Sequence, residues 1–188
     1  MPPVRLVGGA LATLVAAALA ASCGSDHQAA SAGSAGSAAG TASPAGLSSQ
    51  DRTWLASAHQ AGMAEIEAGE LASRKGATAT VRSLGSMLVT DHTRLDHQLT
   101  TTAKHLGADL PTAPSTAQIE EQHKLTSATS GKGFDVAFVG AMIAAHRTAI
   151  ADGATEASHG SAPQVVSLAK RAAPVLRHHL MMFQQAAP

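Results

Sequence analysis

The sequence predicts an all-α domain built from four long helices, and three observations support this fold class. Apolar side chains recur every three or four residues over long stretches, as in amphipathic helices. Glycine and proline fall between these stretches, where helices end. Only 2% of the 188 residues are aromatic, whereas strands favour aromatic and β-branched side chains. A β-sandwich or barrel is therefore disfavoured.

The composition also excludes several functional classes. The 13 Lys and Arg residues balance 13 Asp and Glu residues, so the clustered positive charge of a strongly basic nucleic-acid binder is lacking. One tryptophan, three phenylalanines and no tyrosine offer little for base stacking. A single cysteine excludes an intramolecular disulfide framework and a cysteine-based zinc site. We therefore expect no nucleic-acid partner.

Residues 1–22 have the features of a secretory signal peptide. A positive residue, Arg5, precedes an apolar run that ends in small residues. This run leads directly to the only cysteine, Cys23, in a pattern that resembles the lipobox of bacterial lipoproteins. The resemblance implies cleavage before Cys23, lipidation of Cys23, and a membrane-anchored protein outside the cytoplasm. Ala20 stands where the usual leucine would be, so secretion without a lipid remains the alternative.

Two further segments follow this signal. Residues 23–47 are mostly Gly, Ala and Ser, which cannot bury enough apolar surface to order themselves, and we expect a disordered linker. Residues 48–187 form the helical domain. Its periodicity and its glycine and proline positions predict four long helices and one short one, at 49–74, 77–106, 116–128, 134–159 and 162–186. Ser115 and Gln118 form a predicted capping box for the short helix, and Pro163 suits the first turn of the last.

The long connection at 107–133 bears on the topology. It is long enough to cross the bundle from end to end, which would make the second and third long helices parallel. This is the ferritin-like arrangement of a four-helix bundle, with a short helix in the crossover. A simple up-and-down bundle remains the alternative, because periodicity alone does not decide between the two.

Each long helix carries polar side chains on or beside its apolar stripe. At a rise of 1.5 Å per residue, these side chains fall within one layer about 10 Å thick. His97 and His178, by contrast, point away from the stripes of their helices. The residues of the predicted layer are Glu65, Asp91, His92, His146 and His179.

Carboxylates and imidazoles that converge inside a bundle suit a transition metal, here iron, zinc or copper. The five layer residues are therefore candidate metal ligands. The Glu-x-x-His motif of di-iron bundles is missing at the three candidate histidines, because Val89, Ile143 and Leu176 stand three positions before them. The alternative is a buried hydrogen-bonded network that binds no metal.

Five segments of the domain share their order and spacing with a known family. They are Met63–Glu67 with Leu71-Ala72, Met87–His92, Gly133–Asp135, Met142–His146 and Ala173–Leu180. With these segments the chain resembles a family of exported bacterial proteins, the family of domain of unknown function 4142, often described as predicted outer membrane proteins. The resemblance implies a ferritin-like fold and gives no reaction. It matches histidines of the family's pattern to His92, His146 and His179.

Two functional hypotheses follow. The first is an exported, lipid-anchored helical bundle that binds a metal in the bacterial cell envelope, in a stress or redox role. The second is a non-catalytic envelope scaffold whose polar layer only fixes helix register and whose surface binds an unidentified protein. The sequence contains no phosphate-binding loop, nucleophile elbow or zinc-protease motif, so we assign no catalytic residue.

Overall fold

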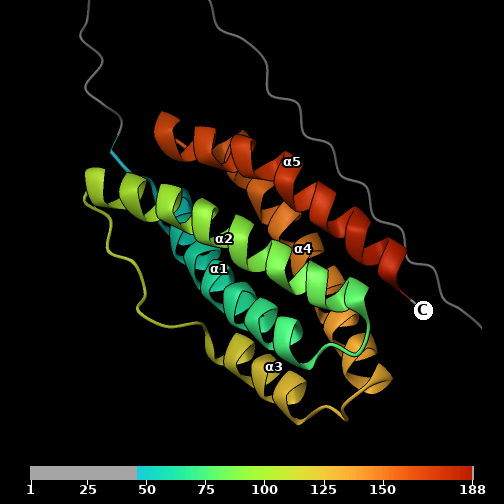
Figure 1. The fold of residues 1–188 in the computed structure, drawn as a ribbon. Coiled ribbons are helices and arrows are strands. Elements are labelled where there is room, and N and C mark those ends of the chain that lie inside the picture. The colour runs from blue at the N-terminus through green and yellow to red at the C-terminus, as the bar shows by residue number, and fades with distance from the viewer. Residues whose placement is uncertain (1–45, 188) are drawn as a thin grey trace, which may run out of the picture. The chain divides into compact units, whose positions relative to one another are not determined.

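The computed structural model describes residues 46–187, and these residues form five helices and no strand (Figure 1). The all-helical prediction is thus confirmed, and each observed boundary lies within two residues of the predicted one. The predicted signal peptide and nearly all of the predicted linker lie outside the described residues. The helices are α1 (Ser49–Lys75), α2 (Ala79–His105), α3 (Thr116–Ser127), α4 (Lys132–His159) and α5 (Pro163–Ala186).

The helix ends follow from local sequence. Ser48 caps α1, and its side chain exchanges hydrogen bonds with Asp51 in a capping box. The predicted box of Ser115 and Gln118 caps α3 in the same way. Pro163 begins α5, where its missing N–H needs no partner.

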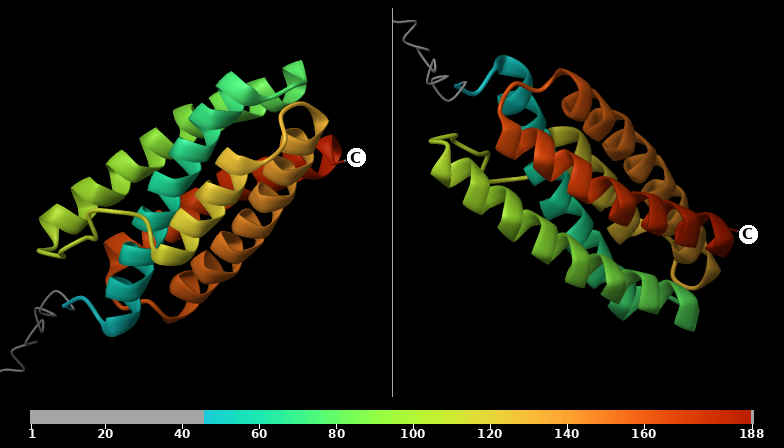
Figure 2. Two further views of the ribbon diagram at one scale, coloured as in Figure 1. Left: turned by 90° about the horizontal axis from the view of Figure 1, so that it is seen from below. Right: turned by 90° about the horizontal axis from the view of Figure 1, so that it is seen from above.

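The long helices form two antiparallel hairpins, one of α1 and α2 and the other of α4 and α5. Between the hairpins, α1 packs against α4 and α2 packs against α5. The segment after α2 returns along the bundle and places α3 over α1 and α4 (Figure 2). As a result, α2 and α4 run in the same direction, and the long connection crosses the bundle as the sequence predicts.

Two apolar clusters occupy opposite halves of the bundle. The first includes Leu88, Phe138 and Phe183, and the second includes Trp54 and Val165. By length and composition α4 would suit a membrane span, a test that the core helices of soluble bundles also pass, and its phenylalanines belong to the first cluster. The level between the two clusters is where the predicted polar layer falls.

Glycines bring α1 and α2 unusually close just beyond this layer. A Cβ atom added to Gly69 would lie 2.7 Å from the carbonyl oxygen of Gly85, and one added to Gly85 would lie 2.5 Å from the oxygen of Gly69. Both distances are below van der Waals contact, so neither position accepts a side chain without movement of the backbone. This close approach sets the spacing between Glu65 on α1 and His92 on α2.

Two aspartates tie the hairpins together at opposite ends of the bundle. Asp51 of α1 accepts hydrogen bonds from the backbone N–H groups of Ser161 and Ala162, in the α4–α5 loop, at 3.0 and 3.1 Å. Asp135 of α4 accepts from the N–H groups of Ala77 and Thr78, in the α1–α2 loop, at 2.8 and 3.0 Å. Each hairpin therefore supplies the hydrogen-bond acceptor for backbone N–H groups in the loop of the other.

This reciprocity has a counterpart in the sequence, which repeats one pattern at a constant offset in the two hairpins. An aspartate, an aromatic residue, a buried glycine and a loop glycine occur in the same order and spacing in both. In the first hairpin these are Asp51, Trp54, Gly69 and Gly76, and in the second they are Asp135, Phe138, Gly153 and Gly160. The repeat explains why Asp51 and Asp135 make their loop contacts at equivalent places in the two hairpins.

Glu156 of α4 is fully buried beside Asp51 and its contact with the α4–α5 loop. Its Oε2 accepts a hydrogen bond from Gln50 at 3.2 Å, whereas its Oε1 has no partner among the described residues. Burial and the neighbouring Asp51 carboxyl raise the pKa of Glu156 to about 7. Burial also opposes the charge of Asp51, but hydrogen bonds from Ser48 and Ala162 prevail and lower its pKa to about 2.

We expect Glu156→Gln to remove part of the pH dependence of stability. The folded-state pKa of Glu156 lies above the ordinary value of 4.5, so its unfavourable effect is absent below pH 4.5 and grows as the pH rises through about 7. The variant should gain about 2–3 kcal/mol relative to the wild type between pH 4.5 and pH 8. Urea unfolding at both pH values measures this, and a constant difference between the two proteins would contradict it.

Candidate metal centre

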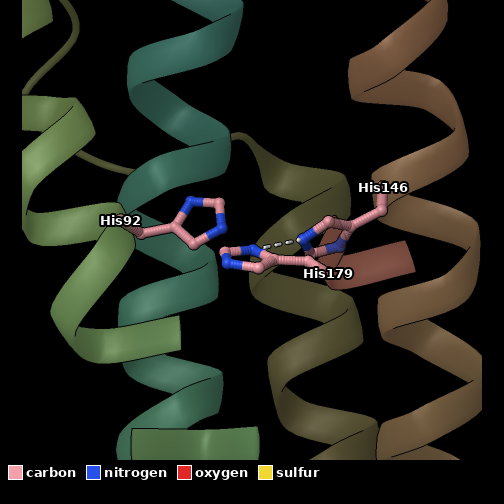
Figure 3. Close-up of side chains that lie close together, drawn as sticks. All are labelled: His92, His146 and His179. Carbon is pink, nitrogen blue, oxygen red and sulfur yellow. Dashed lines mark hydrogen bonds between the residues drawn. The ribbon is translucent and has the colours of Figure 1, made fainter. Parts of the chain in front are cut away.

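Three histidines from different helices meet between the two apolar clusters. His92 of α2, His146 of α4 and His179 of α5 point toward one another (Figure 3). One ring nitrogen from each lies within 4.8 Å of the other two. The residues are at most 4% exposed. The structure therefore brings three of the five predicted layer residues around one point.

The first histidine is held by a carboxylate from the neighbouring helix. The Nδ1 atom of His92 lies 2.9 Å from Oε2 of Glu65, which is itself only 4% exposed. The second carboxylate oxygen lies 3.5 Å from Nδ1 of His146 and makes no hydrogen bond. The Nε2 atom of His92 also has no partner among the described residues.

The other two histidines are each held through one ring nitrogen as well. Nδ1 of His146 lies 2.9 Å from the carbonyl oxygen of Met142, one turn earlier in α4. A carbonyl oxygen only accepts, so this nitrogen carries the hydrogen and Nε2 carries the lone pair. Nε2 of His179 lies 3.0 Å from Oδ2 of Asp91, and the same reasoning places a lone pair on its Nδ1 while Asp91 is ionised.

We call the nitrogens held by Glu65, Met142 and Asp91 the outer nitrogens, and the other nitrogen of each ring the inner one. The inner nitrogens of His146 and His179 are 3.2 Å apart. With both outer nitrogens donating, two lone pairs face each other across this distance. Such a contact is repulsive unless a proton or a metal cation lies between them. The inner nitrogen of His92 adds a third lone pair to the same space when that ring is neutral.

Burial and the two nearby carboxylates set the protonation of the rings. Burial opposes a positive charge on His92, but the adjacent Glu65 carboxylate outweighs it and raises the pKa of His92. Burial lowers the pKa of His146 and that of His179, and the Glu65 and Asp91 carboxylates offset this only in part. His146 and His179 therefore favour the neutral form, and His92 is the ring that more readily holds a proton.

The structure divides the five predicted residues into two groups. The three imidazoles face one another, whereas Glu65 and Asp91 contact outer nitrogens. His97 and His178 are exposed, as predicted. The carbonyl group of Met142 completes the arrangement, and the sequence carries no signal for it, because every helical residue presents such a group. The sequence also gave no sign of which nitrogen of each ring would face inward.

The inner nitrogens have the composition of a transition-metal site. Neutral imidazole suits zinc, copper and iron, and three histidines with a free fourth position are a known zinc arrangement. Ligands bound at about 2.0–2.1 Å to a tetrahedral ion lie about 3.3 Å apart. The His146 and His179 pair already has about this separation at 3.2 Å, and the ring nitrogen of His92 lies within 4.8 Å of both.

Comparisons with known proteins agree with this fold. A crystal structure of a DUF305 fragment from Deinococcus radiodurans is similar, with a TM-score of 0.65 and 16% sequence identity. The likeness covers 74% of this chain and 96% of that one, and it extends to the fold alone. No curated protein matches the chain. The profile of the family described as domain of unknown function (DUF4142) matches residues 36–186, and the chain belongs to that family.

Proposed function

We propose that this protein is an exported, lipid-anchored helical bundle that binds one transition-metal ion in the bacterial cell envelope. The ligands are the inner nitrogens of His92, His146 and His179, and the metal is zinc, copper or iron. The convergence of three buried ring nitrogens carries this proposal. A stress or redox role in the envelope would follow from bound copper or iron.

The partners of the outer nitrogens support the proposal. Metal-binding histidines generally donate their second N–H to a carboxylate or a backbone carbonyl, which fixes the tautomer and the ring orientation. Glu65, Asp91 and the Met142 carbonyl occupy these positions. We therefore assign Glu65 and Asp91 as residues that orient the ligands, in place of the direct ligand role that the sequence suggests.

The crossover connection supports a ferritin-like assignment of the bundle. In di-iron proteins of that fold, bridging carboxylates and two Glu-x-x-His motifs point inward. Here the inward groups are imidazoles, and the carboxylates bind behind them. The fold would thus be shared, whereas the metal site would hold a single ion.

The proposed location, outside the cytoplasm and anchored by a lipid, rests on the N-terminal residues. The apolar run of residues 6–22, the lone Cys23 and the linker to residue 47 suit a lipoprotein whose helical domain lies beyond the membrane surface. This part of the proposal is independent of the metal site.

Metal binding should depend on the inward histidines and not on an exposed neighbour. We expect the purified protein to bind one equivalent of zinc, copper or iron, and His146→Ala to lower the affinity at least tenfold. His178→Ala, on the same helix as His179 but exposed, should bind like the wild type. Elemental analysis after dialysis and calorimetric titration measure both.

The outcome also separates the two functional hypotheses. If none of the three metals binds stoichiometrically to folded protein, the layer is a structural hydrogen-bond network and the scaffold hypothesis holds. Equal metal loss in the His146 and His178 variants would likewise contradict the proposed site.

Replacing the orienting carboxylate should weaken metal binding and change its proton balance. Glu65 raises the pKa of His92, so this ring holds a proton more readily than an ordinary histidine, and metal binding must displace that proton. We expect Glu65→Gln to lower the affinity about 10- to 100-fold and to release fewer protons. Calorimetry in buffers of different ionisation enthalpy counts the protons, and unchanged release would contradict this role of Glu65.

The lipid anchor has a direct test at the mature N-terminus. We expect mass spectrometry of protein expressed in a bacterial host to find Cys23 as the first residue, with the added mass of acyl chains. A Cys23→Ser variant should lose the lipid and leave the membrane fraction. An unmodified terminus at another residue would overturn the anchor and favour secretion.

A further inference from the structure

A large cavity adjoins the histidine layer. It has a volume of about 640 Å³ and extends from Glu65 and His92 to Trp54 and Leu168 in the second apolar cluster. Cavities of 300–1,000 Å³ are typical of small-molecule sites. The long helices α1, α2, α4 and α5 all contribute to its wall, with two residues of α3 at one side.

Small residues along its wall leave this space open. Alanine and glycine make up nearly half of the lining residues, and Gly153 of α4 illustrates the effect. Gly153 is buried, yet a Cβ atom added there would meet no atom within 4 Å. In a well-packed interior such an atom would contact its neighbours. The bundle therefore contains room that its own side chains do not fill.

Two unsatisfied polar atoms belong to residues that line the cavity. Glu65 and His92 both line it, and both are only 4% exposed. Oε1 of Glu65 and Nε2 of His92 have no hydrogen-bond partner among the described residues. Buried polar atoms without partners are costly, so a ligand that supplies a hydrogen-bond donor to Oε1 would be favoured.

The charges of the lining residues narrow the class of ligand. Glu121 of α3 and Asp152 of α4 also line the cavity, and none of the described lining residues is Lys or Arg. Together with Glu65, these carboxylates disfavour an anion such as a fatty acid. The apolar remainder of the wall favours a hydrocarbon or aromatic body.

We propose that this cavity binds a neutral, mainly apolar molecule whose single hydroxyl group donates a hydrogen bond to Oε1 of Glu65. Long-chain alcohols and alkylphenols have this chemistry. The proposal goes beyond metal binding and does not require it, because Oε1 is not the oxygen that holds His92.

Three matched probes test the ligand class. 4-Hexylphenol has the hydroxyl donor, hexylbenzene lacks it, and 4-hexylbenzoate is an anion at neutral pH. We expect saturable binding of 4-hexylphenol, and binding at least tenfold weaker for each of the other two. Trp54 is the only tryptophan of the chain and lines the cavity, so its emission reports binding alongside calorimetry. Measurements before and after treatment with EDTA should agree for 4-hexylphenol.

Two substitutions on α4 test the location. Gly153→Leu fills the cavity and should weaken 4-hexylphenol binding at least tenfold, and so should Ala149→Leu, one turn earlier. Ala154→Leu adds the same side chain at an exposed position beside Gly153 and should bind like the wild type. Circular dichroism identifies any variant that does not fold.

The outcomes distinguish this proposal from the metal site. Loss of metal binding in His146→Ala with 4-hexylphenol binding retained supports two separable sites. Absence of saturable binding by 4-hexylphenol would overturn the cavity proposal, whether or not a metal binds. Equal binding of 4-hexylphenol and 4-hexylbenzoate, or of the wild type and two folded cavity-filling variants, would overturn it as well.

Discussion

The interior of this bundle is constrained by three buried imidazole rings whose inner nitrogens face one another. A buried polar atom needs a partner, and the inner nitrogens of His146 and His179 cannot serve each other while both outer nitrogens donate. A cation or a shared proton resolves the conflict. The rest of the layer is consistent with either, because each carboxylate stabilises positive charge on the ring it contacts.

The bundle holds this layer in place from both ends. Asp51 and Asp135 each fasten the loop of the opposite hairpin, and the glycine contact between α1 and α2 fixes the distance from Glu65 to His92. The two apolar clusters lie on either side of the layer. Side chains that are already positioned before binding lose less conformational entropy when the ion or the molecule binds. The scaffold therefore favours preformed sites over sites assembled by folding around a ligand.

The sequence predicted the helices and the residues of the layer because both depend on periodicity. A side chain on an apolar stripe must face inward, whatever the details of packing, so His92 and His146 were identifiable and His178 could be set aside. The division between ligating and orienting groups was not predictable. It depends on the ring rotamers and on the Gly69–Gly85 contact, which determine the positions of individual atoms. Periodicity determines only which face of a helix a residue occupies. Asp51 and Asp135 were missed for a different reason, since their partners are backbone groups, although the repeated pattern around them was present in the sequence.

The geometry bears on the number of ions the centre would hold. A pair of metals about 3.5–4 Å apart needs carboxylates that bridge them or additional inward ligands. In this bundle the candidate carboxylates are already engaged behind the rings: Asp91 binds the outer nitrogen of His179, and one oxygen of Glu65 binds that of His92. Three nitrogens around one point, with Glu65 and His92 also lining the apolar cavity, suit a single ion beside a space for a neutral organic molecule. The small residues of α4 are then as necessary to the site as the histidines, because bulky ones would close the space that the polar atoms line.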